Sequence, residues 1–337
     1  MTTNPAQPHQ ARQRALDLAA DLGFALAAVT DAQPSAHTEH VRQWITDGKH
    51  AEMTYLEKNL DTRLDPTHLL PGCQSILCVA DAYHPPQPPQ ETSPSPDNKA
   101  KAETAAYAAG RDYHKVMKKK LHRLADALRE QYPDHTFRAT VDTAPILERE
   151  HAARAGLGWI GKHTLLIHPR HGSYLLLGCL LTNLPMQTCA DAGYPTPAVP
   201  PDDHCGTCTR CIDACPTQCI TPYSVDAANC ISYLTLEHRS DFTPKQAAAL
   251  SSDDASLIAG CDICQQVCPH NTTENRIPLP IRDDYTPRPH ANGLDPAEVI
   301  DWTESDRLRH LAGTALTRMS LAMLHRNAQA ILDHRDT

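Results

Sequence analysis

The sequence has few aromatic residues, no long apolar run and no excess of positive charge. Aromatic side chains make up 5% of the 337 residues, and the formal net charge is -9 at pH 7. A negatively charged chain has no general attraction for phosphate, so any contact with nucleic acid must come from local basic patches. No stretch approaches the roughly 18 consecutive apolar residues of a membrane span. The first residues contain neither an export signal nor a twin arginine, so we expect a cytoplasmic protein with no membrane partner.

The pattern of apolar residues predicts an α+β fold. A hydrophobic content of 41% is enough for a buried core. Helical spacing over 10–29 is followed by a strand-like run over 74–83, a proline-rich loop over 84–104 and a second helix with one apolar face, formed by Val116, Leu121, Leu124 and Leu128. Residues 137–184 then alternate between strand and helix, which predicts a mixed sheet covered by helices. No G-x-G-x-x-G motif follows a strand, so a dinucleotide-binding domain is unsupported.

The thirteen cysteines are clustered, which indicates metal binding rather than a disulfide framework. The motif C-x2-C-x2-C-x3-C-P, which wraps a cubane iron–sulfur cluster, is present at Cys205, Cys208, Cys211, Cys215 and Pro216. A shorter motif, C-x2-C-x3-C-P, is present at Cys261, Cys264, Cys268 and Pro269. Three thiolates in a tight loop hold one cluster while the fourth points toward another, so the motif predicts two clusters.

The spacing assigns four thiolates to each [4Fe–4S] cluster. The first cluster takes Cys205, Cys208, Cys211 and Cys268, and the second takes Cys215, Cys230, Cys261 and Cys264. A structural zinc site is the alternative, because paired C-x2-C units also bind zinc. The repeated motif with its prolines favours the clusters. We expect the remaining cysteines to be small packing residues rather than ligands, namely Cys219, Cys73, Cys78, Cys179 and Cys189.

Changes in composition predict three domains. The chain becomes rich in proline, aspartate and threonine from about residue 186, and another extended segment follows the second cysteine motif. We expect a mixed α/β domain over 1–185, a two-cluster ferredoxin-like domain over 186–275 and a C-terminal helical segment over 276–337. Two clusters carry single electrons, so the N-terminal domain is expected to hold their acceptor. Asp142 follows a predicted strand in that domain, where it either caps the next helix or takes part in catalysis.

Several long motifs surround the cysteines in a fixed order and extend over nearly the whole chain. In the N-terminal half they are RLDPTHLLPGCQSI (63–76), YAAGRDYH (107–114) and DTAPILEREHAARAGLGWIGK (142–162). In the C-terminal half they are CISYLTLEHR (230–239), GCDICQQVCPHN (260–271) and GTALTRMSLAMLHRNAQAIL (313–332). In this order they resemble the epoxyqueuosine reductases, a family of cobalamin-dependent enzymes that modify tRNA.

The resemblance implies a base-off cobalamin in the N-terminal domain and reduction of epoxyqueuosine to queuosine at the wobble position of tRNA. Electrons would pass through the two clusters to the cobalamin. Asp142 matches the family's proposed proton donor, and we expect burial against the corrin and apolar neighbours to keep its carboxyl protonated by raising its pKa. The cobalamin and substrate contacts expected from the family motifs are Arg63, Tyr107, Asp112, His114, Lys162, His163 and Ser173.

The resemblance also implies a tRNA partner, together with an electron donor, and we expect the protein to be a monomer. The target base must leave the anticodon loop to reach the cofactor. Loop and phosphate contacts are expected at Glu237, His238, Arg239, Arg318, Arg326 and Asn327. Packing is the alternative role of the last helix, because apolar residues form a stripe along it, at Leu316, Met319, Met323 and Leu324.

Some positions depart from the family pattern, and two other functions compete with this one. Cys219 is additional, His163 stands where asparagine is usual, and His270 stands where tryptophan is expected. A reductive dehalogenase would share the cobalamin and the clusters, but such enzymes are normally exported with a twin-arginine signal. A ferredoxin-type electron-transfer protein without catalysis would leave the motifs over 105–175 unexplained.

Overall fold

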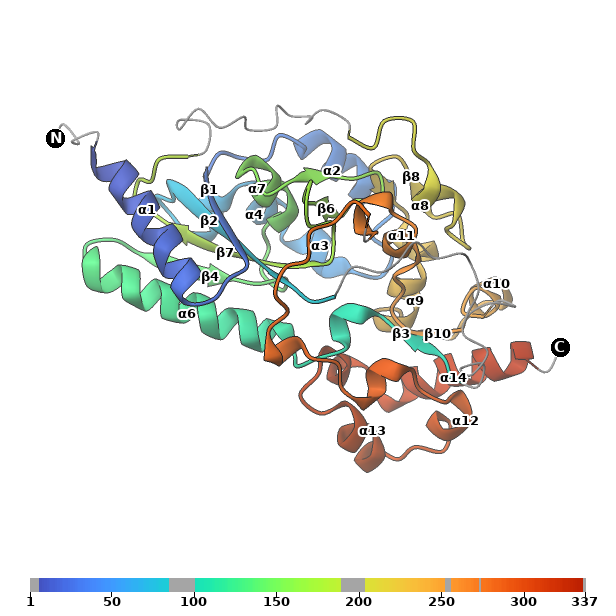
Figure 1. Ribbon diagram of the computed structural model, residues 1–337. Helices are drawn as coiled ribbons and strands as arrows, with labels where there is room; N and C mark the ends of the chain where they lie inside the picture. The colour runs from blue at the N-terminus through green and yellow to red at the C-terminus, as the bar shows by residue number, and fades with distance from the viewer. Residues whose placement is uncertain (1–5, 85–100, 189–203, 252–255, 273, 336–337) are drawn as a thin grey trace.

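The computed structural model describes residues 6–84, 101–188, 204–251, 256–272 and 274–335, and its main sheet has four strands (Figure 1). Their order is β1 (Leu26–Asp31), β2 (Ser75–Ala82), β7 (Leu175–Thr182) and β4 (Phe137–Thr140). Each neighbouring pair is antiparallel, so the prediction of a mixed sheet was wrong. β2 and β4 run in the same direction, but β7 lies between them and runs against both.

Helices α1 (Ala6–Asp21) and α6 (Tyr113–Gln131) cover one face of this sheet (Figure 1). The four apolar positions predicted for one face of the second helix are all buried in α6, at Val116, Leu121, Leu124 and Leu128. The first predicted helix is shorter than expected, because Gly23, with φ of 74°, ends α1 and the chain enters β1. The predicted strand over 74–83 is β2.

Helix α7 (Glu148–Arg154) covers the opposite face of the sheet. Alternate residues of β2 point to the two faces, because Leu77 packs with α6 and Cys78 packs with α7. The connection between β1 and β2 contains α2 (Thr38–Thr46), α3 (Thr54–Lys58), α4 (Leu60–Leu64) and α5 (Pro66–Leu69). A short hairpin of β5 (Trp159–Ile160) and β6 (Leu166–Ile167) follows α7.

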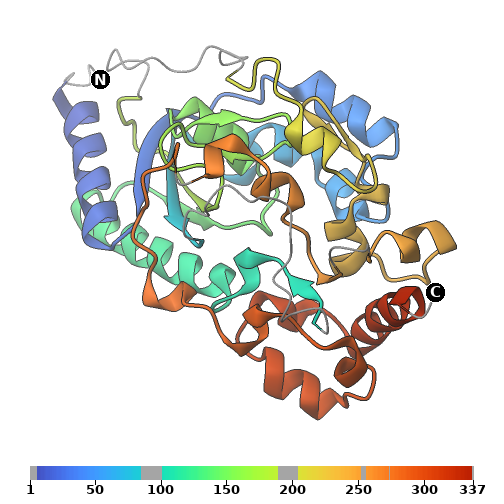
Figure 2. The ribbon, with the colours of Figure 1, turned by 45° about the vertical axis from the view of Figure 1, so that its right-hand side comes forward.

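The cysteine-rich region consists of short elements that lie beside the sheet domain (Figure 2). They are α8 (Arg210–Asp213), β8 (Ile220–Thr221), β9 (Ser224–Val225), α9 (Ile231–Leu236), α10 (Pro244–Ala248), β10 (Leu257–Ala259) and α11 (Ile263–Gln266). The C-terminal part contains α12 (Pro296–Val299), α13 (Glu304–Leu311) and α14 (Leu321–Arg335). None of the helices in the described parts of the chain combines the length and apolarity of a membrane span.

The C-terminal helices share one core with residues from both preceding predicted domains. Strand β10 pairs in parallel with β3 (Glu103–Thr104), which brings the cysteine region against the segment before α6. Ala102, Ile258 and Ile331 lie in the same buried cluster. The predicted apolar stripe is buried as well, at Leu316, Met319, Met323 and Leu324, so the packing role of this segment is confirmed, although α14 itself begins only at Leu321.

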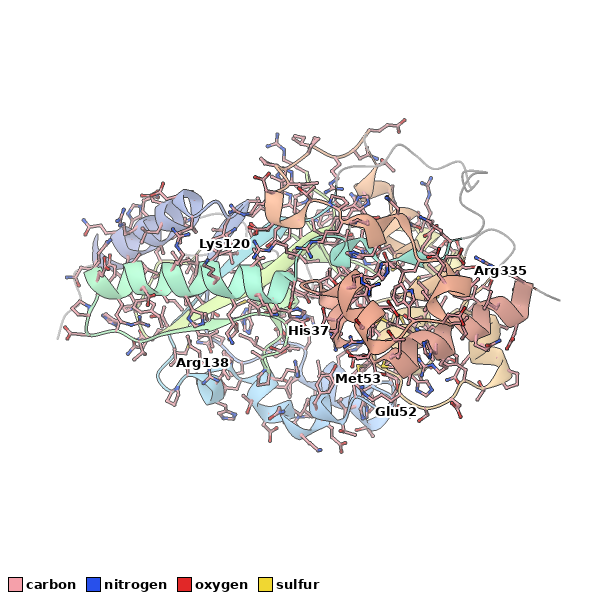
Figure 3. All side chains as sticks on the ribbon, turned by 90° about the horizontal axis from the view of Figure 1, so that it is seen from below. His37, Glu52, Met53, Lys120, Arg138 and Arg335 are labelled. Atoms are coloured by element: carbon pink, nitrogen blue, oxygen red, sulfur yellow. The ribbon has the colours of Figure 1, made fainter. Side chains whose placement is uncertain are left out.

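A buried ion pair joins α6 to the sheet. Lys120 Nζ donates to Asp81 Oδ2 over 2.7 Å, and both side chains are almost fully buried. The hydroxyl of Tyr285 donates to the same carboxylate over 3.0 Å, so the C-terminal part is attached at this point too. Lys120 lies midway along α6 in Figure 3. Because both charges are removed from water, loss of one partner would leave the other uncompensated.

Candidate active site and iron–sulfur centres

The four thiols predicted for the first cluster line one cavity. They are Cys205, Cys208, Cys211 and Cys268, and the other residues that line the cavity are Lys162, His163, Ile167, Arg210, Pro269 and His270. Each thiolate of a cubane binds a different iron, so its ligands must surround a volume rather than meet at a point. The four thiols line a common cavity, so their arrangement fits a cluster.

The thiols predicted for the second cluster also lie together. Burial, followed by the charges of Cys230, Asp262 and Cys215, raises the pKa of Cys261 to about 12. Burial raises the pKa of Cys264 as well, and the neighbouring Cys261 and Cys230 contribute to the rise. These charge effects are consistent with a shared neighbourhood for the four thiols. The set therefore suits the second cluster.

Cys219 is buried as predicted, but it lies against this second group of thiols. Its sulfur is 3.5 Å from the sulfur of Cys215 and also forms a hydrogen bond with Cys230. Among the other cysteines, Cys78 and Cys179 face each other across β2 and β7 with sulfurs 3.9 Å apart. Cys73 is buried too, so these three are packing thiols as expected. Cys189 lies outside the described residues.

Asp142 follows β4 and is held by two neighbours. Its backbone has φ of 47°, a left-handed conformation that costs energy in a non-glycine residue. Its N–H donates to Glu148 Oε1 over 2.8 Å, while its Oδ2 lies 3.0 Å from His114 Nε2. The cap of α7 is instead Leu147, without a side-chain hydrogen bond. The structure therefore does not use Asp142 as a helix cap.

Asp112 orients the ring of His114. It is the N-cap of α6, where its carboxylate accepts the backbone N–H of His114, and its Oδ1 is also 2.8 Å from His114 Nδ1. The ring of Tyr113 stacks on the imidazole at 3.9 Å between centroids. Because both ring nitrogens face carboxylates, the three side chains form the chain Asp112–His114–Asp142.

The proton of this chain resides on His114 at neutral pH. Burial lowers the pKa of His114, but hydrogen bonds and charges from Asp112 and Asp142 raise it by more, to about 9. Burial raises the pKa of Asp142, but the hydrogen bond and charge of His114 lower it by more, so that it ends below its usual value. The expectation of a raised pKa for Asp142 was therefore wrong, because it considered burial without the cationic neighbour.

Glu148 is a site residue that the sequence reasoning did not identify. Burial, with the charge of Asp142, raises the pKa of its carboxyl to about 8. The side chain is therefore mostly neutral at pH 7 and can still accept the N–H of Asp142. Its only signal in the sequence was its place in the DTAPILERE motif, six residues after Asp142.

Aromatic and charged side chains surround Asp142. Tyr107 meets Tyr113 edge to face at 5.9 Å, and Arg318 forms an ion pair with Glu237. The charge of Asp142 contributes an upward shift to the pKa values of Arg63, Tyr107 and Arg318. These predicted residues therefore lie near Asp142. Tyr55, which the sequence reasoning also missed, belongs to the same neighbourhood and is 48% exposed.

Three of the predicted cobalamin contacts lie at the cluster region. Lys162 Nζ donates to the carbonyls of Gly206 and Cys208, and His163 lines the cavity of the first cluster. Ser173 is buried, and its hydroxyl bonds to Gln265 and Asn271. The assignment of Ser173 to a cofactor contact is wrong for this structure, because the cluster region already covers its side chain.

The structure also divides the predicted tRNA contacts. Asn327 is fully buried and donates to the carbonyls of Thr235 and Ile258, so the expectation of a contact with RNA was wrong. Arg326 donates to three backbone carbonyls, those of Leu234, His238 and Ser240, and its guanidinium lies over the ring of Phe242. Both side chains are used inside the fold.

The remaining predicted tRNA contacts lie where α9 ends. His238 is buried, and its Nδ1 is 3.3 Å from a carboxylate oxygen of Glu52. Glu52 lies beside the C-terminal helices in Figure 3. Arg239 is exposed, as are parts of the Arg318 and Glu237 side chains. The accessible charges are therefore Glu237, Arg239 and Arg318.

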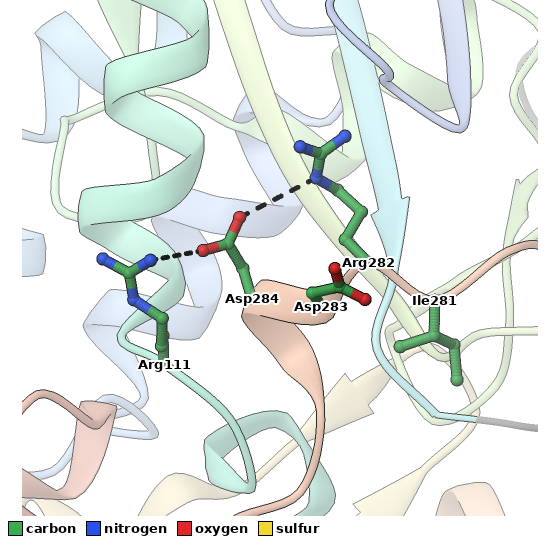
Figure 4. A pocket seen from close by; sticks show the side chains of 5 residues that line it. All are labelled: Arg111, Ile281, Arg282, Asp283 and Asp284. Carbon is green, nitrogen blue, oxygen red and sulfur yellow. Dashed lines mark hydrogen bonds and ion pairs between the residues drawn. The ribbon is translucent and has the colours of Figure 1, made fainter.

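A separate surface hollow is lined by Arg111, Ile281, Arg282, Asp283 and Asp284 (Figure 4). Arg111 lies 2.6 Å from one carboxylate oxygen of Asp284, and Arg282 lies 4.0 Å from the other. These pairs attach the start of α6 to the C-terminal part. None of the side chains that line this hollow belongs to the group around Asp142.

Comparison with known proteins agrees with this geometry. The family model "Epoxyqueuosine reductase QueG, DUF1730" matches residues 63–143, which run from Arg63 past Asp142. A model of the "4Fe-4S double cluster binding domain" matches residues 204–271. An epoxyqueuosine reductase of Synechococcus sp. (strain CC9605) is 40% identical over 87% of this chain and 84% of the relative. One from Synechocystis sp. (strain PCC 6803) is 38% identical over 91% of this chain and 99% of the relative.

The chain belongs to the epoxyqueuosine reductase family. A crystal structure of an epoxyqueuosine reductase with an epoxyqueuosine-modified tRNA-Tyr stem loop matches with a TM-score of 0.82 and 26% identity, over 96% of this chain and 81% of that one. A selenomethionine-labelled epoxyqueuosine reductase matches with a TM-score of 0.81. These matches therefore do not favour the two competing functions, a reductive dehalogenase and a ferredoxin-type electron-transfer protein. The α+β fold and the double-cluster domain expected from the sequence are confirmed.

Proposed function

We propose that this epoxyqueuosine reductase family member reduces epoxyqueuosine to queuosine in the anticodon of a tRNA. The observation that carries the proposal is the position of Asp142, which contacts His114 and lies near the exposed Arg318–Glu237 pair. A proton source thus lies beside charges that a nucleic acid can reach. The reaction removes the epoxide oxygen as water and consumes two electrons and two protons.

The thiols hold the groups that deliver the electrons. Cys205, Cys208, Cys211 and Cys268 bind the first [4Fe–4S] cluster in the cavity that they line. The second cluster is bound by Cys215, Cys230, Cys261 and Cys264. Cys219 is a neighbour of this set rather than a ligand, because the four assigned thiols already complete a cubane.

The surroundings of Asp142 suit a cobalamin. Nε of Arg63 is buried without a hydrogen-bond partner among the described residues, and Tyr55 exposes its ring nearby. The amide side chains of a corrin offer acceptors to such an arginine, and its flat faces suit aromatic neighbours. When bound, cobalamin supplies the strongly reducing cobalt chemistry that opens an epoxide. Arg63, Tyr55 and Tyr107 are the residues that would hold it.

Asp142 and His114 deliver a proton to the departing oxygen. The proton that the imidazolium of His114 carries passes to the carboxylate of Asp142, 3.0 Å away, and from there to the oxygen. Asp112 keeps the ring in orientation through Nδ1. Glu148 holds the backbone of Asp142 in its left-handed conformation. The protein therefore supplies the proton and its position, while the electrons come from the bound groups.

The surface around Arg318, Glu237 and Arg239 receives the anticodon loop. Arg318 can reach a phosphate with the donors that its ion pair leaves free, and Arg239 adds a second positive charge. The modified base must leave the loop stack to approach Asp142. A cytoplasmic location, a monomeric state and a separate electron donor remain predictions.

The decisive experiment measures cofactors and turnover on the same protein. The chain is purified without oxygen and with added cobalamin, and iron, corrin and conversion of an epoxyqueuosine-containing tRNA stem loop are measured with a chemical reductant. We expect about eight iron atoms per chain, four in each cluster, together with bound corrin and queuosine as product. Full iron without bound corrin and without product would instead support the simple electron-transfer protein.

A further inference from the structure

His163 is a buried histidine inside the cavity of the first cluster. It follows the β5 strand, is 3% exposed, and lines the cavity together with the four cysteines predicted to bind that cluster. Gly161 makes room for its ring, because a Cβ on this glycine would lie 3.2 Å from Cε1 of the imidazole. The fold therefore holds the ring in one place against the cavity.

One hydrogen bond determines which nitrogen of His163 carries the proton. The backbone N–H of Leu165 donates to Nδ1 over 3.2 Å. A nitrogen that accepts a hydrogen bond has no proton of its own, so the neutral ring must carry its hydrogen on Nε2. Nε2 is fully buried and has no hydrogen-bond partner in the parts of the chain that the structure describes. A buried donor of this kind requires an acceptor, and the described residues do not provide one.

We infer that His163 donates its Nε2–H to a sulfur of the first [4Fe–4S] cluster and thereby raises the reduction potential of that cluster. The inference rests on the assignment of the first cluster to the cavity of Cys205, Cys208, Cys211 and Cys268. Reduction adds negative charge to a cluster, and an N–H directed at sulfur stabilises that charge. His163 is a positioning and tuning residue, since it contacts the cluster without ligating iron.

A substitution of His163 leaves the other polar groups at the cavity in place. Lys162 directs its ammonium to the carbonyls of Gly206 and Cys208, and these bonds stabilise the cysteine loop. The ring of His270 packs edge to face on Trp159 at 4.9 Å between centroids. A change that affects only the Nε2 donor therefore isolates the contribution of His163.

The test compares His163→Leu with His163→Gln in the full chain with both clusters and cobalamin. Leucine removes the donor, whereas the terminal amide of glutamine can place an N–H near the position of Nε2. The reduction potentials of both clusters are measured by titration followed by electron paramagnetic resonance. We expect His163→Leu to make reduction of one cluster about tenfold less favourable, a shift of about 59 mV for one electron, and His163→Gln to recover most of it. Unchanged potentials in His163→Leu would overturn the inference.

A second measurement requires no substitution of His163. In protein grown with nitrogen-15 histidine, pulsed electron paramagnetic resonance of the reduced cluster should detect coupling to one ring nitrogen, because a hydrogen bond places Nε2 next to sulfur. If His163→Leu fails to retain iron, the coupling is measured in His270→Gln, which leaves His163 as the histidine lining the cavity among the described residues, and its absence there would refute the hydrogen bond. Neither readout uses tRNA, so failure of the proposed reaction and failure of this inference are distinguishable.

Discussion

His114 Nε2 lies 3.0 Å from Asp142 Oδ2, and the same ring is held through Nδ1 by Asp112. The two residues come from different elements, the first turn of α6 and the segment after β4. Because of this contact, the carboxylate of Asp142 shares a proton with the imidazole of His114. The geometry of this pair leads directly to predictions about catalysis and its dependence on pH.

The substitution Asp142→Asn should abolish most turnover while leaving the cofactors in place. Asparagine keeps the shape of the side chain but cannot transfer the proton, and general acids typically contribute a factor of about 100 to 10,000. The measurement is the single-turnover rate on an epoxyqueuosine stem loop, with iron and corrin determined on the same sample. Asp126→Asn is the matched control, because Asp126 lies on the exposed face of α6 and pairs with Arg129. Normal activity in Asp142→Asn would remove Asp142 from the mechanism.

The rate should fall as the pH rises through about 9. His114 is protonated below its raised pKa of about 9 and loses its proton above it, so it can then no longer supply a proton to Asp142. The decline should approach about tenfold per pH unit. Single-turnover rates between pH 6 and 10 provide the measurement, and His114→Gln should be slow without this alkaline decline. Glu148 is the other group whose ionisation could cause the alkaline decline, because it loses its proton near pH 8 and contacts Asp142. The variant Glu148→Gln tests this, since glutamine does not ionise.

The cysteines of the second cluster should differ in their effect on iron content. Cys230→Ala removes a ligand and should reduce iron from about eight to about four atoms per chain, because one cubane is lost. Cys219→Ala should keep about eight, although its sulfur lies 3.5 Å from that of Cys215. Iron is quantified after anaerobic reconstitution. If Cys219→Ala lost the cluster and Cys230→Ala kept it, the two assignments would have to be exchanged.

The substitution Arg318→Ala should weaken binding of the tRNA stem loop at low salt. An arginine that contacts phosphate contributes about one unit to the slope of log affinity against log salt concentration, so the slope should become shallower by that amount. Affinity is measured by fluorescence anisotropy at several salt concentrations. Arg309→Ala is the control, because Arg309 is an exposed arginine paired with Asp306 on α13. Equal slopes for both variants would show that Arg318 makes no phosphate contact.

Local sequence patterns determined several features of this protein. The spacing of Cys205, Cys208 and Cys211 requires a tight loop whose thiols face one volume, so the first cavity could be predicted without the fold. The apolar period of α6 likewise fixed which face is buried. The motif around Asp142 indicated the family and the site, because its residues are adjacent in the chain. Each of these features depends on neighbours a few residues apart.

Only the tertiary structure decided the features that depend on distant segments. The pKa of Asp142 is lowered because α6 brings His114 against it, and no pattern within the DTAPILERE motif carries that information. Asn327 and Ser173 are buried because separate segments pack over them. His163 faces the cluster cavity because the β5–β6 hairpin is packed against the cysteine loops. Long-range packing thus determined the electrostatics and accessibility of residues whose chemical types the sequence had already supplied.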